Sequence, residues 1–209
     1  MIVMKFGGSS LATAKKIRRA ADIVGRELAR RPLVVVSASG KTTNNLIAAA
    51  ERALGGAVDL ETIERHHCAL ARELAVDARV VEPLLDQLAA LLHGVSLIRE
   101  LTERTRDLVM SYGERMSARL FAAALDAGGA PAAAVNAFDA GLVTTPEHGG
   151  ARPLDDIGPG LAAALGRYEV VPVITGFVGR DTAGNITTLG RSGSDYTASI
   201  VGAAVGAEE

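Results

Sequence analysis

The stretch MIVMKFGGSS, residues 1–10, leads from a short apolar run through a single lysine into a pair of glycines, and a helical pattern follows at once. Glycines at a strand-to-helix turn let backbone amides approach an anion without interference from a Cβ atom. The new helix adds unpaired amide hydrogens and a positive dipole end. The stretch therefore predicts a phosphate-binding turn at Gly7 and Gly8, with Lys5 as its charge. A plain βα turn with a surface lysine is the alternative, but the chain has only four lysines.

The residues that follow complete a βαβ unit. Residues 12–30 place apolar side chains at helical spacing, and Pro32 ends that pattern. Residues 33–37 (LVVVS) are a continuous branched run, typical of a strand buried on both faces. Further strands are expected at 132–135, 142–145 and 170–176. The pattern predicts an α/β fold, a three-layer αβα sandwich with a mainly parallel sheet.

Composition limits the classes of function. With 209 residues the chain can bury a sizeable core, and a formal net charge of −2 with interspersed signs argues against nucleic-acid binding. The single cysteine, Cys68, cannot form an internal disulfide, and its neighbouring histidines point to different sides of a helix. No apolar run is long enough to span a bilayer, and no signal-peptide pattern is present. We expect a cytoplasmic protein that binds a small molecule and neither a membrane nor nucleic acid.

A second polar turn, SASGKTTNN at residues 37–45, ends a strand and opens a helix. Its hydroxyl and amide side chains can cap the helix or bind an anion. The triplet Gly40-Lys41-Thr42 resembles the end of a P-loop, but Val35 stands where that pattern requires a glycine. The P-loop is therefore rejected, and capping alone stays open beside anion binding.

Residues 44–110 read as helices interrupted at Gly55-Gly56 and Gly94, and they predict a helical layer or an inserted lobe without chemistry. The segment SYGERMSA, residues 111–118, leads into another helix. Ser111 and Glu114 have the spacing of a capping box, so Glu114 caps an amide or, alternatively, presents a carboxylate to an ammonium group.

The last third of the chain ends in another glycine-hydroxyl turn. Pro172 in the strand at 170–176 indicates an edge or a strand start, and residues 177–190 resemble a hairpin. The turn TTLGRSGSDYT, residues 187–197, opens a helix expected at 197–205. It predicts a second phosphate cradle, in which Arg191 can grip a carboxylate or phosphate. Asp195 can orient a lysine, hold Mg²⁺ or cap the helix.

The four motifs KFGGSS, SAS with Thr43-Asn44, SYGERMS and TTLGRSGSDY together closely resemble those of the aspartokinases of the amino acid kinase family, in order and spacing over essentially the whole chain. The resemblance implies the amino acid kinase (carbamate kinase-like) fold and transfer of the ATP γ-phosphoryl group to the β-carboxylate of L-aspartate, with Mg²⁺. That reaction is the first step toward lysine, methionine and threonine. The resemblance also implies a homo-oligomer for the full-length enzyme.

The resemblance also implies roles for individual residues. Lys5 would stabilise charge on the transferring phosphoryl group, and Asp195 would orient Lys5. Thr43, Glu114 and Arg191 would hold aspartate, with Glu114 at its ammonium group and Arg191 at its α-carboxylate. The remaining residues would line the pocket or bind phosphate: Gly7, Gly8, Ser9, Ser192, Gly193 and Ser194. No dedicated metal ligand is expected.

One departure concerns length. Family members continue beyond a helix such as 197–205 into a segment that holds the nucleotide, whereas this sequence stops at Glu209. Residues 1–209 are thus expected to form the N-terminal portion of the catalytic domain, without the nucleotide half or regulatory ACT domains. An uncovered sheet edge and apolar surface then predict self-association or poor solubility. The alternative functions are a catalytically incomplete aspartate- or phosphate-binding module and a kinase acting on another acid.

Overall fold

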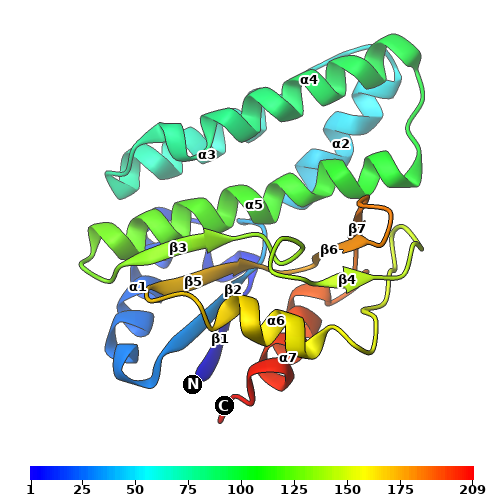
Figure 1. The fold of residues 1–209 in the computed structure, drawn as a ribbon. Coiled ribbons are helices and arrows are strands. Elements are labelled where there is room, and N and C mark those ends of the chain that lie inside the picture. Colours follow the sequence, from blue (N-terminus) through cyan, green and yellow to red (C-terminus); the bar gives the residue numbers. More distant parts are fainter.

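The computed structural model describes residues 1–209 and is built on a parallel sheet of four strands (Figure 1). The strands lie in the order β1 (Ile2–Phe6), β2 (Pro32–Val36), β5 (Val171–Thr175) and β3 (Ala132–Val135). A smaller sheet contains β4 (Val143–Thr144), β6 (Val178–Asp181) and β7 (Ile186–Thr188), and the β6–β7 pair is the antiparallel hairpin that the sequence predicts. The predicted βαβ unit is confirmed by the parallel pairing of β1 with β2.

Helices cover both faces of the larger sheet, which confirms the three-layer prediction. Alternate β2 side chains point to opposite faces: Val34 and Val36 belong to a core cluster of 33 residues that includes α1 (Ala14–Arg26) and α5 (Glu103–Ala127). Leu33 and Val35 belong to a cluster of 11 residues with α6 (Gly158–Leu165) and α7 (Gly193–Val205). All five β2 residues are buried, as expected for a strand covered on both sides.

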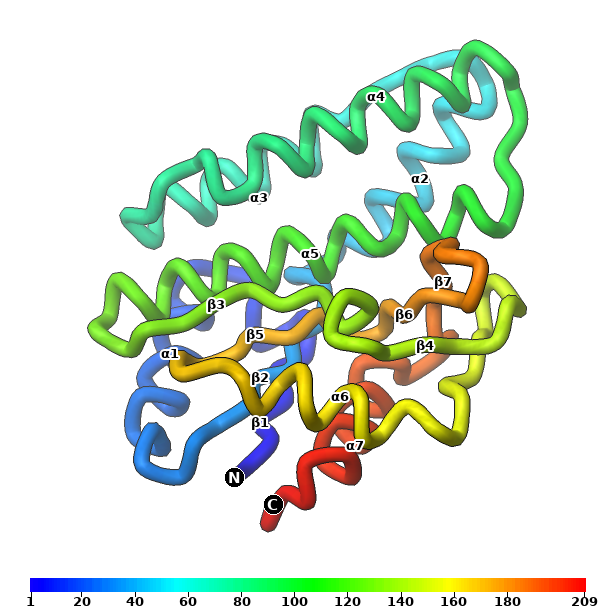
Figure 2. The backbone as a smooth tube through the Cα atoms, in the orientation of Figure 1, coloured from blue at the N-terminus to red at the C-terminus, as the bar shows by residue number.

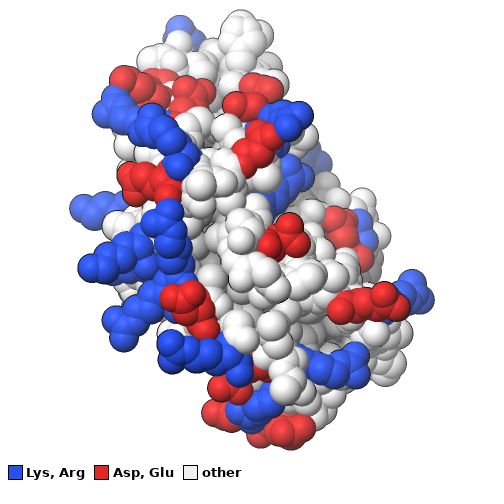
Figure 3. Space-filling view, turned by 90° about the vertical axis from the view of Figure 1, so that its left-hand side faces the viewer, with Lys and Arg blue, Asp and Glu red and all other residues white.

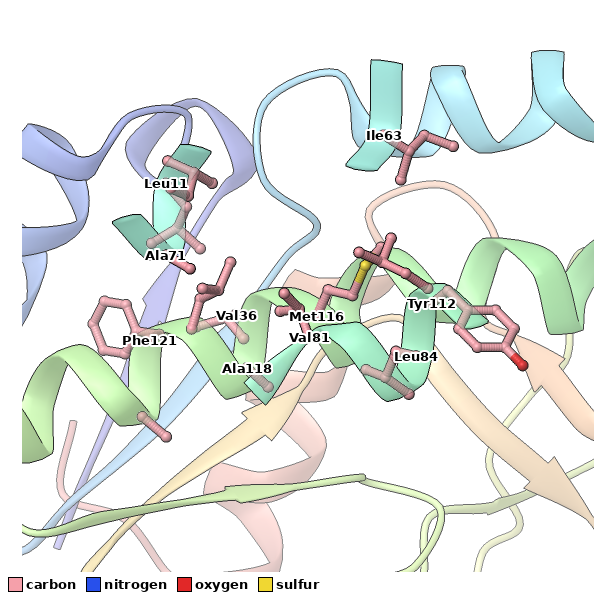
Figure 4. Packing of buried hydrophobic residues seen from close by; sticks show 14 of the residues in the cluster. Leu11, Val36, Ile63, Ala71, Val81, Leu84, Tyr112, Met116, Ala118 and Phe121 are labelled. Carbon is pink, nitrogen blue, oxygen red and sulfur yellow. The ribbon is translucent and has the colours of Figure 1, made fainter. Parts of the chain in front are cut away.

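Three further helices lie outside α5 and extend the core. They are α2 (Thr42–Leu54), α3 (Glu61–Leu74) and α4 (Glu82–Ile98), and Figure 2 traces them beyond α5 on the side away from the sheet. The larger core cluster continues into them without a break through Ile63 and Leu84. Figure 4 shows this packing around Met116 and Phe121 of α5. The segment is therefore an additional helical layer.

The sequence misplaces several element boundaries. Helix α4 continues through Gly94 to Ile98, so this glycine does not interrupt it. Pro172 indicates an edge or a strand start: strand β5 lies inside the sheet, so the edge is wrong, but Pro172 is the second residue of the strand, so the strand start is confirmed. The proline is tolerated because hydrogen-bonded pairing with β2 begins only at Val173. Helix α7 starts at Gly193, four residues before the predicted start at Thr197.

The predicted capping box at Ser111 and Glu114 is also wrong. Both residues lie in the middle of α5, which runs unbroken for 25 residues from a cap at Thr102. The Ser111 hydroxyl donates to the carbonyl of Leu108, and so it caps nothing. Gly113 is also inside this helix, and the loop at Ala38 packs closely against it. An added Cβ atom at position 113 would lie 2.8 Å from the Cβ of Ala38, so glycine leaves room for the loop.

This close approach gives a stability prediction. Replacing Gly113 by alanine is expected to lower the free energy of unfolding by about 1–3 kcal/mol, because the loop at Ala38 must move. Gly94→Ala is the matched control, since Gly94 is also helical and an added Cβ atom there meets nothing within 4 Å. The control is expected to gain about 0.5–1 kcal/mol from helix propensity. Urea unfolding measures both, and equal effects would contradict the packing argument.

The surface carries charges of both signs. Figure 3 shows Lys and Arg side chains gathered toward one side of a face, with Asp and Glu among them. Exposed basic residues of α1 include Lys15, Lys16, Arg18 and Arg19. No helix of the structure has the length and apolar character needed to cross a lipid bilayer.

Candidate active site at the carboxyl ends of the strands

A polar cleft of about 330 Å³ lies where β1, β2 and β5 end, the edge at which α/β sheets usually bind ligands. The turn after each of these strands contributes to it, and the middle of α5 forms part of its wall. Its lining is rich in glycine and serine and holds three charged side chains. The lining residues are Lys5, Gly8, Ser37, Ala38, Gly40, Thr43, Glu114, Phe177, Gly190, Ser192, Gly193, Ser194 and Asp195.

Lys5 is held by an ion pair from the first turn of α7. Its Nζ atom lies 2.7 Å from Oδ1 of Asp195, and its side chain is 26% exposed. Asp195 is the third residue of α7, whose N-cap is Ser192 in the left-handed conformation. Asp195 is thus not the N-cap that was one alternative. The amino end of α7 opens at Gly193, a lining residue, so its dipole favours an anion beside Lys5.

The first two polar turns are joined directly. Gly8 accepts a hydrogen bond from the amide of Gly40 at 2.9 Å, and Ser39 donates to the carbonyl of Leu11 at 2.7 Å. A Cβ atom on Gly8 would lie 2.5 Å from the carbonyl oxygen of Ala38. Glycine is therefore required at position 8 for backbone contact as well as for access by a ligand.

Glu114 is a buried carboxylate with one unused oxygen. Its Oε1 atom accepts a hydrogen bond from the amide of Ala38 at 3.0 Å, while Oε2 is buried without any partner. Burial raises the pKa of Glu114 to about 8, and the hydrogen bond from Ala38 opposes this only in part. A buried carboxylate with a free oxygen in a cleft is suited to a cationic ligand.

The structure gathers most of the predicted site residues in this cleft. Thr43, Glu114, Asp195, Lys5, Gly8 and the run 192–194 all line it. Gly7 lies outside the lining, although a Cβ atom there would be 3.4 Å from the Lys5 ammonium group. Ser9 is exposed, and its carbonyl accepts a hydrogen bond from Lys16. Arg191 is exposed and does not line the cleft.

Phe177 is a lining residue that sequence reasoning missed. It adopts a φ of 66°, a conformation that side chains with a Cβ rarely take. Its amide donates to the Thr197 hydroxyl at 2.9 Å, and its ring lies so close to Gly193 that a Cβ atom there would be 2.6 Å away. Strained backbone that is held by several contacts is typical of functional sites. The sequence carries no local signal for it.

One histidine of α3 also contacts the second turn, although the sequence analysis assigned no role to it. The His66 Nε2 atom lies 2.9 Å from the Ser39 hydroxyl. That hydroxyl already donates its hydrogen to Leu11, so His66 must donate through Nε2. His67 is fully buried, which lowers its pKa to about 4, and its Nδ1 donates to the carbonyl of Ile63. Helix α3 therefore contacts the second turn through His66, while the neighbouring His67 is a buried, neutral imidazole.

The arrangement can bind a zwitterion and a phosphate together. Glu114 offers negative charge for an ammonium group, whereas Lys5 and the amino end of α7 offer positive charge for a phosphoryl group. No three His, Cys, Asp or Glu side chains are grouped as a metal site. Phosphate-bound Mg²⁺ needs only one or two protein carboxylates, and Asp195 is the one lining carboxylate beside Lys5.

Comparison with known proteins identifies the family. The model of the amino acid kinase family matches residues 1–209. Aspartokinase 1, chloroplastic, of Arabidopsis thaliana is 40% identical over 99% of the chain and 38% of its own length. Aspartokinase 3 of Bacillus subtilis is 37% identical over 96% of the chain and 45% of its own length.

Solved structures give the same result. E. coli aspartokinase III in complex with aspartate and ADP has a TM-score of 0.86 and 31% identity, and the match covers all of this chain and 48% of that one. The complex of the same enzyme with lysine and aspartate also has a TM-score of 0.86. The chain thus spans about two fifths of its Arabidopsis relative and about half of these structures. With the family pattern matched over its full length, the chain belongs to the amino acid kinase family.

Proposed function

We propose that this chain carries the acceptor and phosphate-binding part of an aspartate kinase, which transfers the γ-phosphoryl group of ATP to the β-carboxylate of L-aspartate. The observation that carries the proposal is the unpartnered, buried Oε2 atom of Glu114 in the same cleft as Lys5. A site for an ammonium group beside a site for a phosphoryl group fits an amino acid that is to be phosphorylated. The solved relative that binds aspartate and ADP supports the same substrates.

In the proposed reaction an oxygen of the β-carboxylate attacks the γ-phosphorus atom, and the bond to the bridging oxygen of ADP breaks. Such a transfer needs positioning and charge stabilisation and no nucleophile from the protein. Lys5, oriented by Asp195, stabilises the charge on the transferring oxygens. Glu114 and Thr43 hold aspartate, and Arg191 binds its α-carboxylate after its exposed side chain turns into the cleft.

The other roles in the proposal concern phosphate and metal. Gly7, Gly8 and Ser9 bring the first turn to the phosphates, and residues 192–194 bring the amino end of α7 to them. Asp195, the lining carboxylate beside Lys5, would hold the Mg²⁺ that accompanies ATP. The chemistry that Mg²⁺ would supply there is neutralisation of charge on the β- and γ-phosphates.

The proposal extends to the cellular setting. We propose that residues 1–209 form the acceptor portion of a catalytic domain, which the four-motif pattern supports; the curated relatives are more than twice as long as the region that matches. We propose a homo-oligomeric enzyme of amino-acid biosynthesis toward lysine, threonine and methionine. A cytoplasmic location is part of the proposal, although the names of the Arabidopsis relatives place those proteins in chloroplasts.

Calorimetric titration with L-aspartate tests the substrate assignment. We expect aspartate to bind, L-glutamate to bind more weakly, and Glu114→Ala to abolish aspartate binding, because the ammonium group loses the only buried carboxylate that lines the cleft. Asp126→Ala is the matched control, since Asp126 is exposed near the end of the same helix. Parallel titration with Mg-ATP and an assay for ADP complete the experiment.

The outcomes separate the alternatives. Aspartate binding without ADP formation favours a binding module, whereas aspartate-dependent ADP release favours the kinase. If a folded chain prefers another acid, the substrate assignment changes and the proposed reaction class stays the same. A folded chain that binds no acid under any condition contradicts the assignment of Glu114.

A further inference from the structure

Asp107 is a second buried carboxylate on α5, outside the cleft and with no role so far. Its side chain is 0% exposed and is surrounded by donors. The Thr188 hydroxyl donates to Oδ1 at 2.6 Å, and the Thr188 amide donates to Oδ2 at 3.1 Å. The amide of Gly149 donates to both oxygens, and Nδ1 of His148 lies 3.0 Å from Oδ2. Asp107 therefore ties the 148–149 turn and the end of β7 to α5.

Both tied segments adjoin Gly190, one along the chain and the other by packing, and Gly190 lines the cleft. Thr188 precedes it by two residues, and the carbonyl of Thr188 also accepts the amide of Ala151 at 2.9 Å. A Cβ atom on Gly190 would lie 3.3 Å from the carbonyl oxygen of Gly149, so the 148–149 turn packs directly against it. Gly190 has a φ of 71° and begins the loop that contains Arg191. Its position thus depends on contacts that converge on Asp107.

Asp107 and Glu114 also lie in fixed relation to one another. They are seven residues apart in one continuous helix, which is close to two turns, so both point to the same face about 10 Å apart along the axis. One carboxylate enters the cleft, and the other holds the loop at its rim.

We propose that Asp107 is a positioning residue for substrate binding: it fixes the loop 190–192 so that Arg191 reaches the α-carboxylate at a set distance from Glu114. Helix α5 then sets the distance between the groups that bind the two charged ends of the amino acid. The inference rests on the proposed function for the identity of the ligand, but the ordering of the loop by Asp107 does not.

The negative charge of Asp107 is essential to this role. Every partner presents a donor, namely two backbone amides, a hydroxyl and an imidazole nitrogen. An ionised carboxylate accepts from all of them, whereas asparagine turns an NH₂ group toward at least one N–H donor. Asp107→Asn thus keeps the size of the side chain and breaks the network. Thr188→Val is the milder variant, because it removes only the hydroxyl donor.

The test combines ligand affinity with a double-mutant cycle. L-Aspartate and β-alanine, which lacks the α-carboxylate, are titrated into wild type, Asp107→Asn, Arg191→Ala and the double variant. Asp126→Asn is the control on the same helix. We expect Asp107→Asn to weaken aspartate about tenfold or more, to leave β-alanine unchanged, and to have no further effect once Arg191 is replaced. Amide exchange at Thr188, Gly149 and Gly193 is expected to rise in the same variant.

A purely structural role predicts something different. If Asp107→Asn or Thr188→Val lowers the melting temperature but weakens aspartate and β-alanine alike, or acts additively with Arg191→Ala, the proposal is overturned. Unchanged amide exchange in folded Asp107→Asn also overturns it. If the wild type binds no aspartate, the proposed function fails for this chain, and amide exchange alone decides whether Asp107 orders the loop.

Discussion

Replacing Lys5 by alanine is expected to slow aspartate-dependent ADP formation by about 10³-fold, with aspartate affinity nearly unchanged. The ammonium group of Lys5 lies in the cleft beside the amino end of α7, where charge develops on the transferring phosphoryl group. Aspartate is held by other residues in the proposal, so the loss falls on the rate. Steady-state kinetics and calorimetric titration of the same preparations separate the two quantities.

The variant is not expected to unfold the chain. Asp195 loses its partner, but its side chain is 64% exposed, and exposed ion pairs contribute little to stability. Lys15→Ala is the control, because Lys15 is an exposed lysine on α1. Titration with inorganic phosphate and Mg-ATP adds a readout that does not require turnover. Near-native turnover in Lys5→Ala would remove Lys5 from the mechanism.

Replacing Glu114 by glutamine is expected to remove aspartate binding and, at the same time, to stabilise the free chain increasingly as pH rises. The folded chain holds the proton of Glu114 up to a pKa of about 8, whereas the unfolded chain releases it near the usual value of 4.5. Wild-type stability therefore falls as pH rises through this window, by on the order of 3 kcal/mol at pH 7. Glutamine keeps the acceptor for Ala38 and has no such proton to lose.

Unfolding experiments at pH 5, 6, 7 and 8 measure this difference. The gap between Glu114→Gln and wild type should widen with pH, while Asp126→Asn should stay parallel to wild type. The same linkage predicts that aspartate binding at pH 7 releases a proton, because its ammonium group requires the ionised carboxylate. Titrations in buffers of different ionisation enthalpy detect that proton. A gap that is constant with pH, or binding without proton release, argues against a neutral Glu114 in the free chain.

The sequence predicts those parts of the molecule that depend on local pattern. The run at 33–37 indicates a doubly buried strand, and the structure confirms it. Glu114 lies inside α5, so only the resemblance to the family motif indicated its role. Lys5 and Asp195 could be proposed from their motifs, because glycine and hydroxyl residues mark turns at the ends of strands. The meeting of Lys5 with the turn that holds Thr43 follows from a rule of parallel sheets, whose carboxyl ends meet at one edge. The rule does not place Asp195, which follows β7 of the smaller sheet, or Glu114, which lies within α5.

The remainder depends on contacts between distant segments. Ser111 and Glu114 satisfy the capping pattern, yet the helix begins at Glu103 after a cap at Thr102, because buried apolar residues of α5 lie on both sides of them. The strained backbone at Phe177 and the contact between His66 and Ser39 arise only when distant segments pack together. Asp107 is unremarkable in the sequence because its donors lie 41 or more residues away.

The unbroken course of α5 has a consequence for how the sequence can vary. Successive residues of a helix are rotated by about 100° around its axis. Inserting or deleting one residue between Asp107 and Glu114 would therefore rotate one carboxylate away from its partners. The surface turns beyond the ends of α5 face no such restriction. Among functional relatives, insertions and deletions should therefore occur outside the interval 107–114 and be absent within it. A designed single-residue insertion within 107–114 should abolish aspartate binding, whereas the same insertion at Gly129 should be tolerated.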